Sequence, residues 1–359
     1  MSTTTSPVID EAKMHAFGES LVNDAGSMIL GNLAYIGDQL GLFKILADKS
    51  PMTSEQLADA SACNARYLQE WLSAMAAAGW VTYDPAQKSF ILPAEHAPFL
   101  ADEDHPMFMG GALECAIPMA SVTPRILQCF REGGGVAFAH HHPDMSRVIE
   151  RFTSPMLKNF LTKVWLPDLL PEVHQKLTEG ADVADIGCGS GRALTEMAKA
   201  YPKSRFTGYE PNSPSAFRAL NAAKDEGLID RINIHNARSD LMRDESYDFI
   251  STIDVVHDSV DPQGLVRDVK RALRPNGTYF MLEMNASGKL ENNLNPLGKF
   301  FYSISTMYCM TVSLAHGGAG LGTCMGEEKP RQMCKNAGFS QFNKLDFEHP
   351  LAVLYEVKA

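Results

Sequence analysis

The clearest chemical signature in the chain is the run ADIGCGSG at residues 184–191. Glycines allow a tight turn and let the backbone approach a ligand closely. A loop that binds a dinucleotide has the spacing G-x-G-x-x-G, with a small last residue for close packing of helix on strand. That last position is Arg192 here, so the run instead has the spacing G-x-G-x-G with Asp185 two positions before the first glycine. The three glycines are Gly187, Gly189 and Gly191.

Acidic side chains near this loop favour a cofactor with a cationic end over one with a pyrophosphate. Asp185 precedes the loop, and Glu210 follows the next strand-like segment, where a carboxylate can accept hydrogen bonds from both hydroxyls of a ribose. After the third such segment, Asp240 and Leu241 can flank an adenine ring. S-adenosylmethionine carries an ammonium and a sulfonium group. These residues therefore predict a binding site for S-adenosylmethionine.

The elements that must position these residues form a regular alternation from residue 181 onward. Such alternation predicts an α/β fold, a Rossmann-like, doubly wound and mainly parallel sheet of seven strands. Ligands bind at the carboxyl ends of the strands in such sheets. Strand patterns cover residues 182–187, 205–210, 231–235, 247–253, 277–283, 342–347 and 351–357, and helix patterns cover 192–201, 213–227, 261–273 and 327–337.

The region before residue 100 predicts a winged helix. One helix begins at Thr53 or Ser54, a second covers 64–78, and two short strands follow at 80–83 and 89–92. A winged helix that reads DNA presents basic or amide side chains from its second helix. That helix is rich in alanine, and the net charge of the chain is −11, so dimerisation is favoured over nucleic-acid binding.

Composition places the protein in the soluble globular class. The chain has 359 residues, of which 45% are hydrophobic and 21% charged. No basic segment followed by an apolar run indicates a signal peptide, and no run approaches the length of a membrane span. The seven cysteines form no C-x-x-C pair, which indicates reduced thiols. We therefore expect a cytoplasmic protein that does not bind membranes.

The region 181–357 resembles class I S-adenosylmethionine-dependent methyltransferases. The whole chain is similar to two-domain small-molecule methyltransferases of the plant-type O-methyltransferase architecture. The segments HDSVDP at 257–262 and NLNPLG at 293–298 resemble a largely bacterial branch. The resemblance implies a homodimer and a small-molecule acceptor. It also implies three parts: a winged-helix dimerisation domain at 1–100, a helical connector covering the active site at 101–180, and a methyltransferase domain at 181–359.

The same resemblance implies a catalytic histidine. In O-methyltransferases a His-Asp pair lies nine residues after the acidic start of the fourth strand. Nine residues after Asp248 stands His257, followed by Asp258. A histidine is neutral near pH 7 and can accept a proton, which suits a general base. The family orients it with a glutamate at the end of the fifth strand, where Glu283 stands, although Ser259 replaces the tryptophan of the plant enzymes.

Other residues of this region are open to more than one interpretation. Asp254 faces the cofactor or the substrate, or is a solvated turn carboxylate. The insertion between residues 284 and 327 is a lid or pocket wall with a glycine hinge, or a helix that simply packs on the sheet. The histidines at 140–142 form a polar loop near the site rather than a metal centre, so we expect no metal. The aromatic residues expected in the pocket are Phe301, Tyr302 and Tyr308.

A base is needed when the methyl acceptor is a phenol or an alcohol, and matters less for a thiol, a thioether or an amine. The sequence therefore favours transfer to the oxygen of a small, partly apolar molecule. Transfer to sulfur, nitrogen or carbon with the same cofactor site is the alternative. A winged-helix regulator that senses a ligand is an alternative from another class.

Overall fold

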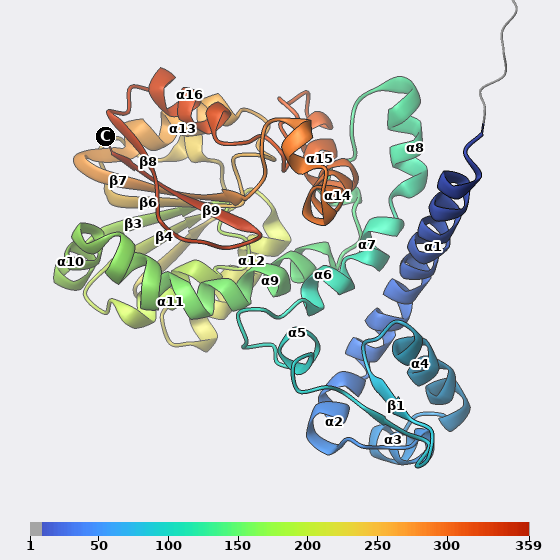
Figure 1. The fold of residues 1–359 in the computed structure, drawn as a ribbon. Helices are drawn as coiled ribbons and strands as arrows, with labels where there is room; N and C mark the ends of the chain where they lie inside the picture. Colours follow the sequence, from blue (N-terminus) through green and yellow to red (C-terminus); the bar gives the residue numbers. More distant parts are fainter. Residues whose placement is uncertain (1–8, 359) are drawn as a thin grey trace, which may run out of the picture. The chain divides into compact units, whose positions relative to one another are not determined.

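The computed structural model describes residues 9–358, which divide into two compact units between Ile117 and Pro118 (Figure 1). The stretch expected to be a connector, 101–180, is therefore shared by the two units. The short helix α7 (Ala116–Ala120) contains the division. Among the described residues, no helix combines the length and the apolar character that crossing a membrane requires.

The first unit confirms the winged helix. Thr53 caps α3 through a capping box, in which the Gln56 N–H donates to Thr53 Oγ1 at 3.3 Å and the Thr53 N–H donates to Gln56 Oε1 at 2.8 Å. Asn64 caps α4, and the two strands pair antiparallel. The elements are α1 (Glu11–Gln39), α2 (Leu42–Lys49), α3 (Ser54–Ser61), α4 (Ala65–Ala77), β1 (Thr82–Asp84), β2 (Ser89–Ile91), α5 (Ala97–Leu100) and α6 (Gly110–Glu114).

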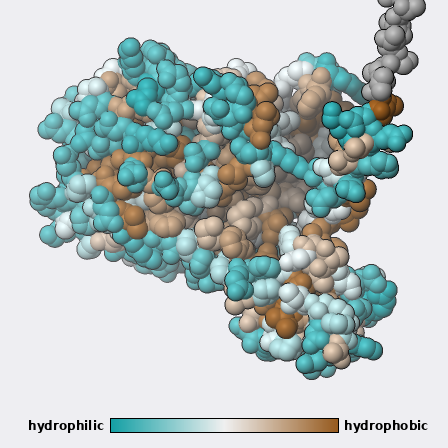
Figure 2. Space-filling view, in the orientation of Figure 1, coloured by the Kyte–Doolittle hydropathy of each residue, from teal (hydrophilic) through white to brown (hydrophobic). Residues whose placement is uncertain are grey.

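The long helix α1 packs only at its C-terminal end. Trp71 of α4 donates a hydrogen bond from Nε1 to the Leu33 carbonyl at 2.8 Å, and its ring lies against Gly37 so closely that a Cβ there would be 2.3 Å from the ring. The earlier turns carry side chains that are mostly solvent-exposed, and hydrophobic residues reach the surface of this unit (Figure 2). Those of α1 with more than half of their surface exposed are Met14, Phe17, Leu21, Val22, Met28 and Ile29.

The second unit confirms the seven-stranded sheet. Its strand order is β5-β4-β3-β6-β7-β9-β8, parallel up to β7, with β9 antiparallel to both of its neighbours. The predicted strand β7 begins four residues earlier than expected, because Leu273 already pairs with Tyr247 before an irregularity in the register. The strands are β3 (Asp182–Ile186), β4 (Arg205–Tyr209), β5 (Ile232–His235), β6 (Tyr247–Ile253), β7 (Leu273–Met284), β8 (Gln341–Lys344) and β9 (Ala352–Lys358).

Both faces of this sheet are buried, as a doubly wound sheet requires. Consecutive residues of β3 belong to different cores: Val183 packs with helices on one face, and Ala184 with helices on the other. The first core includes residues of α10 and α11, and the second includes residues of α13 and α16. The helices that follow strands are α11 (Arg192–Ala200), α12 (Ser213–Asp225), η3 (Ser239–Leu241), α13 (Pro262–Ala272) and α16 (Glu328–Asn336).

Two further groups of helices complete the second unit, one before β3 and one in the insertion after β7 (Figure 1). Each group contains a π-helix, a wide turn that is frequent at functional sites. The first group is α8 (Thr123–Glu132), η1 (Phe138–His140), α9 (Met145–Met156), the π-helix η2 (Leu157–Leu169) and α10 (Pro171–Glu179). The second is η4 (Leu290–Asn293), α14 (Pro296–Ile304), the π-helix η5 (Ser305–Cys309) and α15 (Met310–Leu314).

Candidate functional site

The glycine-rich loop joins the end of β3 to the start of α11. Its three glycines have φ values of 66°, 56° and 80°, a region that favours glycine. Gly191 is the N-cap of α11, and a Cβ there would lie 3.1 Å from Cβ of Ala219. The N–H groups of Gly187 and Cys188 donate to the carbonyl of Tyr209, at 2.7 and 3.3 Å. The loop is therefore fixed to the end of β4.

Glu210 follows β4 directly and completes this loop. Its carboxylate accepts hydrogen bonds from the N–H of Gly189 at 2.9 Å and from the N–H of Asn212 at 2.8 Å. The side chain is buried, and burial raises its pKa against the lowering effect of these two hydrogen bonds. A carboxylate held in this way lies at the position where the sequence predicted recognition of a ribose.

Asp185 lies at the end of β3, next to the first loop glycine, and is only 2% exposed. Ser251 Oγ donates a hydrogen bond to it at 2.7 Å. Burial raises the pKa of Asp185 to about 7; the Ser251 hydrogen bond opposes this shift and the charge of Glu210 adds to it. A cationic group bound beside the two carboxylates would favour their charged forms.

Asp240 and Leu241 form a 3₁₀ turn after β5, at the same edge of the sheet. Both are exposed, and Leu241 leaves 69% of its surface open. The turn is anchored by Ser239, whose hydroxyl donates to Asp268 of α13 at 2.9 Å. The two side chains are therefore open to a ligand rather than used in packing.

A buried histidine–glutamate pair lies at the carboxyl ends of β6 and β7. His257 donates from Nδ1 to Glu283 Oε2 at 2.6 Å, and the Val256 N–H donates to Glu283 Oε1 at 2.9 Å. His257 and Glu283 are each 2% exposed. Burial by itself lowers the pKa of His257, but the charge of Glu283 outweighs it and the pKa lies well above its ordinary value.

Cys309, which the sequence reasoning missed, lies against this pair. It comes from the π-helix η5, is 5% exposed, and interacts with His257, whose pKa it helps to raise. Burial raises the pKa of its thiol, and the neighbouring His257 lowers it. The one signal in the sequence that pointed to this contact is the adjacency of Cys309 to Tyr308, a residue expected in the pocket.

Two further carboxylates follow β6. Asp254 has a φ of 56°, and its Oδ1 has no hydrogen-bond partner within residues 9–358. Burial raises the pKa of Asp254 and of Asp258 to about 7, while the charge of His257 lowers both. Asp254, His257 and Glu283 bring possible ligand atoms within 4.8 Å of one another. The 2.6 Å distance between Nδ1 of His257 and Oε2 of Glu283 is that of a direct hydrogen bond, so this contact does not call for a bridging metal ion.

The three aromatic residues expected in a pocket lie in different surroundings. Tyr308 is 7% exposed and packs with Cys309 and Met145. Phe301 is 2% exposed, and its carbonyl accepts a hydrogen bond from Thr323. Tyr302 leaves 37% of its surface open, and its hydroxyl accepts from the Asn293 amide at 3.1 Å. Of the three, Tyr308 packs directly against Cys309, which lies beside His257.

Comparison with known proteins agrees with this geometry. Residues 28–102 match the family described as "Rv2258c-like winged HTH domain", and residues 177–338 match the family described as "Methyltransferase domain". The chain carries a methyltransferase domain behind a winged-helix domain. The methyltransferase match includes the glycine loop, Glu210 and the His257–Glu283 pair.

Among curated proteins, the methyltransferase domain is similar to a sterol 24-C-methyltransferase of Aspergillus fumigatus, 28% identical over 128 residues, 34% of this chain and 33% of that protein. It is also similar to a ubiquinone biosynthesis O-methyltransferase of Salmonella paratyphi A, 27% identical, covering 31% of this chain and 45% of that protein. The matches thus span less than half the length of these relatives.

Among solved structures, similarity extends over the whole chain. The mitomycin 7-O-methyltransferase MmcR has a TM-score of 0.69 at 17% identity, covering 98% of this chain and 100% of that one. Human N-acetylserotonin methyltransferase, solved with S-adenosylmethionine, has a TM-score of 0.66 at 14% identity, covering 100% of this chain and 99% of that one. At these identities the likeness establishes the fold.

Proposed function

We propose that the protein transfers a methyl group from S-adenosylmethionine to an oxygen atom of a small, partly apolar molecule. The observation that carries this proposal is the buried pair of His257 and Glu283, joined at 2.6 Å on the same sheet edge as the glycine loop. Asp185 and Glu210 would face the cationic and ribose parts of the cofactor. Asp240 and Leu241 would flank its adenine, and Asp254 lies at the neighbouring strand end.

In this mechanism Glu283 fixes the tautomer of His257. Because the carboxylate accepts from Nδ1, the proton of the neutral imidazole stays there, and the other ring nitrogen is the one that accepts the proton of a substrate hydroxyl. S-adenosylmethionine supplies an electrophilic methyl group on a good leaving group. The protein then contributes mainly alignment and the removal of one proton. Asp258 follows the base in the chain, and the charge of His257 lowers the pKa of its carboxyl against the effect of burial.

The first test is calorimetric titration with S-adenosylmethionine, followed by a methyl-transfer screen over phenols, thiols, thioethers and amines. The His257→Ala variant should bind the cofactor normally but lose about 10²–10⁴-fold in turnover of phenols, the usual contribution of a general base. The exposed His316→Ala variant serves as the control. Near-normal turnover in His257→Ala would favour transfer to sulfur or nitrogen, and absence of cofactor binding would refute the whole proposal.

The regulator alternative lacks support in the first unit. On α4 the one arginine, Arg66, is paired with Glu70 at 2.5 Å, and the other exposed residues of the helix carry no positive charge; these are Tyr67, Gln69, Ser73 and Ala77. A reader of DNA needs unpaired basic groups on this helix. A DNA-binding assay with salt titration should therefore show no salt-sensitive binding.

We also propose that the protein is a homodimer in the cytoplasm. Hydrophobic side chains are exposed along α1: Phe17 leaves 68% of its surface open, and Val22 leaves 73%. Such exposure is unusual for a helix face that stays in water. A second copy of the same helix would cover them by a symmetric contact. The seven cysteines are all free thiols, as expected in a reducing compartment.

A further inference from the structure

The middle residue of the triple-histidine segment has an unused ring nitrogen. His141 is 6% exposed, and its Nε2 lies 3.3 Å from the carbonyl oxygen of Val136. A carbonyl can only accept, so Nε2 carries the proton and Nδ1 of the neutral ring is a bare acceptor. Nδ1 is buried and has no hydrogen-bond partner among the described residues. Buried polar atoms are nearly always paired, so this one requires an explanation.

The unused nitrogen belongs to a side chain next to the proposed active site. The His141 ring meets the Tyr308 ring edge-on, with centroids 5.1 Å apart. Tyr308 precedes Cys309, and Cys309 interacts with His257. His141 and His257 therefore contact neighbouring residues of the π-helix η5. Burial lowers the pKa of His141, which keeps the ring neutral and its Nδ1 an acceptor.

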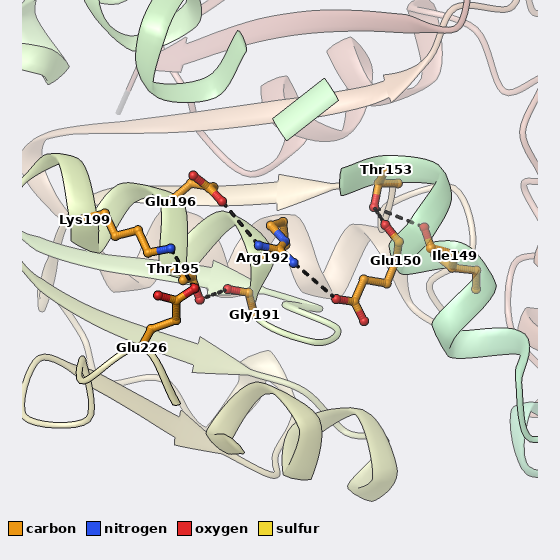
Figure 3. A network of polar contacts seen from close by, with 9 residues as sticks. All are labelled: Ile149, Glu150, Thr153, Gly191, Arg192, Thr195, Glu196, Lys199 and Glu226. Carbon is orange, nitrogen blue, oxygen red and sulfur yellow. Dashed lines mark hydrogen bonds and ion pairs between the residues drawn. The ribbon is translucent and has the colours of Figure 1, made fainter. Parts of the chain in front are cut away.

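The element that follows His141 is fixed to the cofactor loop. Glu150 of α9 lies 3.7 Å from the guanidinium of Arg192, the first residue after the glycine loop, and Arg192 also contacts Glu196 at 3.3 Å (Figure 3). The start of α9 is held by Met145, which packs with Tyr308 and Cys309. His141 thus has a defined position relative to both the glycine loop and the base.

Its two neighbours in sequence have ordinary surroundings. His140 is exposed, and His142 accepts the Asp144 N–H at its Nδ1 at 3.2 Å. Of the three adjacent histidines, His141 alone has a buried nitrogen without a partner. The contrast makes His140 a natural control.

We propose that Nδ1 of His141 accepts a hydrogen bond from a second hydroxyl or N–H group of the methyl acceptor. This inference rests on the proposed methyltransferase function and narrows its substrate class. The acceptor is a small aromatic molecule with two donor groups, one methylated beside His257 and one held by His141. The rings of Tyr308 and Phe138, with centroids 6.1 Å apart, give this region an aromatic wall.

The test compares phenol with the three benzenediols as methyl acceptors. Cofactor binding is first measured by calorimetry on the wild type and on His141→Leu, His141→Asn and His140→Ala, so that a failure of the methyltransferase proposal is seen separately. The wild type should prefer at least one benzenediol by about tenfold in kcat/KM, well beyond the factor of two that a second reactive hydroxyl gives.

His141→Leu should bind S-adenosylmethionine normally and lose this preference, with little change in the rate with phenol. His141→Asn should retain part of it, because the amide oxygen can accept near the place of Nδ1. His140→Ala should behave as the wild type. Equal treatment of phenol and all three diols by the wild type would overturn the assignment, as would an undiminished preference in His141→Leu.

Discussion

Replacing Glu283 with glutamine removes the charge that sets the state of the proposed base. In the folded protein Glu283 accepts from His257 Nδ1 at 2.6 Å and holds the pKa of His257 well above its ordinary value. A hydrogen bond to a charged partner contributes about 1.5–3 kcal/mol, and a neutral one about 1 kcal/mol. Both side chains are almost fully buried, so solvent screening does not reduce these figures.

The sign of the pH dependence follows from the raised pKa. Because folding raises the pKa of His257, its pair with Glu283 stabilises the protein fully below the unfolded pKa of about 6.5. This stabilisation is lost as the pH rises through the folded value. Glu283→Gln should therefore lower the free energy of unfolding by about 1.5–3 kcal/mol at pH 6, and by about 1 kcal/mol or less at strongly alkaline pH.

Activity gives a second reading of the same interaction. His257 can accept a proton only when it is neutral, so kcat/KM for a phenol should rise with pH along a limb above pH 6.5 in the wild type. In Glu283→Gln this limb should move to lower pH. Urea unfolding at pH 6 and at strongly alkaline pH and a pH–rate profile measure both effects, with Glu356→Gln on β9 as the control. If the limb of the kcat/KM profile stays at the same pH in Glu283→Gln, or if the loss of stability does not depend on pH, Glu283 does not set the pKa of His257.

Three other changes test separate parts of the structure. Asp185→Asn should stabilise the cofactor-free protein at pH 8 by on the order of 2–4 kcal/mol, because burial disfavours the charged carboxylate, whose pKa is raised to about 7. Urea unfolding should show that this gain in stability vanishes near pH 4. Calorimetry should show that the variant binds the cofactor more weakly. Gly187→Ala should lower Tm more than Gly189→Ala, since both have positive φ but only at Gly187 would a Cβ meet Val255, at 2.6 Å; equal losses would contradict this. Phe17→Glu on α1 should reduce the mass in light scattering from that of a dimer to 39.4 kDa, and an unchanged mass would exclude this face.

The secondary structure could largely be predicted because its signals are local. The cap at Thr53, the helix expected at 64–78 and the alternation of strands and helices after residue 181 all appear within two residues of the expected positions, apart from β7 and the end of β8. The sequence pattern placed the start of β7 at residue 277. Pairing of Leu273 with Tyr247 overrides that local signal, since a neighbouring strand supplies hydrogen bonds that no local pattern reveals.

The site could be predicted only where a parallel sheet positions it. Parallel strands end at one edge, so residues such as Asp185, Glu210 and His257 come together by topology alone. Cys309 and His141 come from irregular segments. A π-helix closes i→i+5 hydrogen bonds and changes which side chains face inward, so helical periodicity cannot place Cys309.

The acidic groups of the site share one electrostatic property. Asp185, Asp254 and Asp258 all have pKa values raised to about 7 by burial, and burial also raises the pKa of Glu210. A carboxylate in a structural ion pair has a lowered pKa. The raised pKa values of these four carboxylates therefore show that the protein does not itself supply enough positive charge to balance them. A ligand that carries positive charge would remove this mismatch at Asp185 and Glu210 on the glycine loop. The same buried carboxylates that destabilise the fold by themselves would therefore strengthen binding of a sulfonium-bearing cofactor.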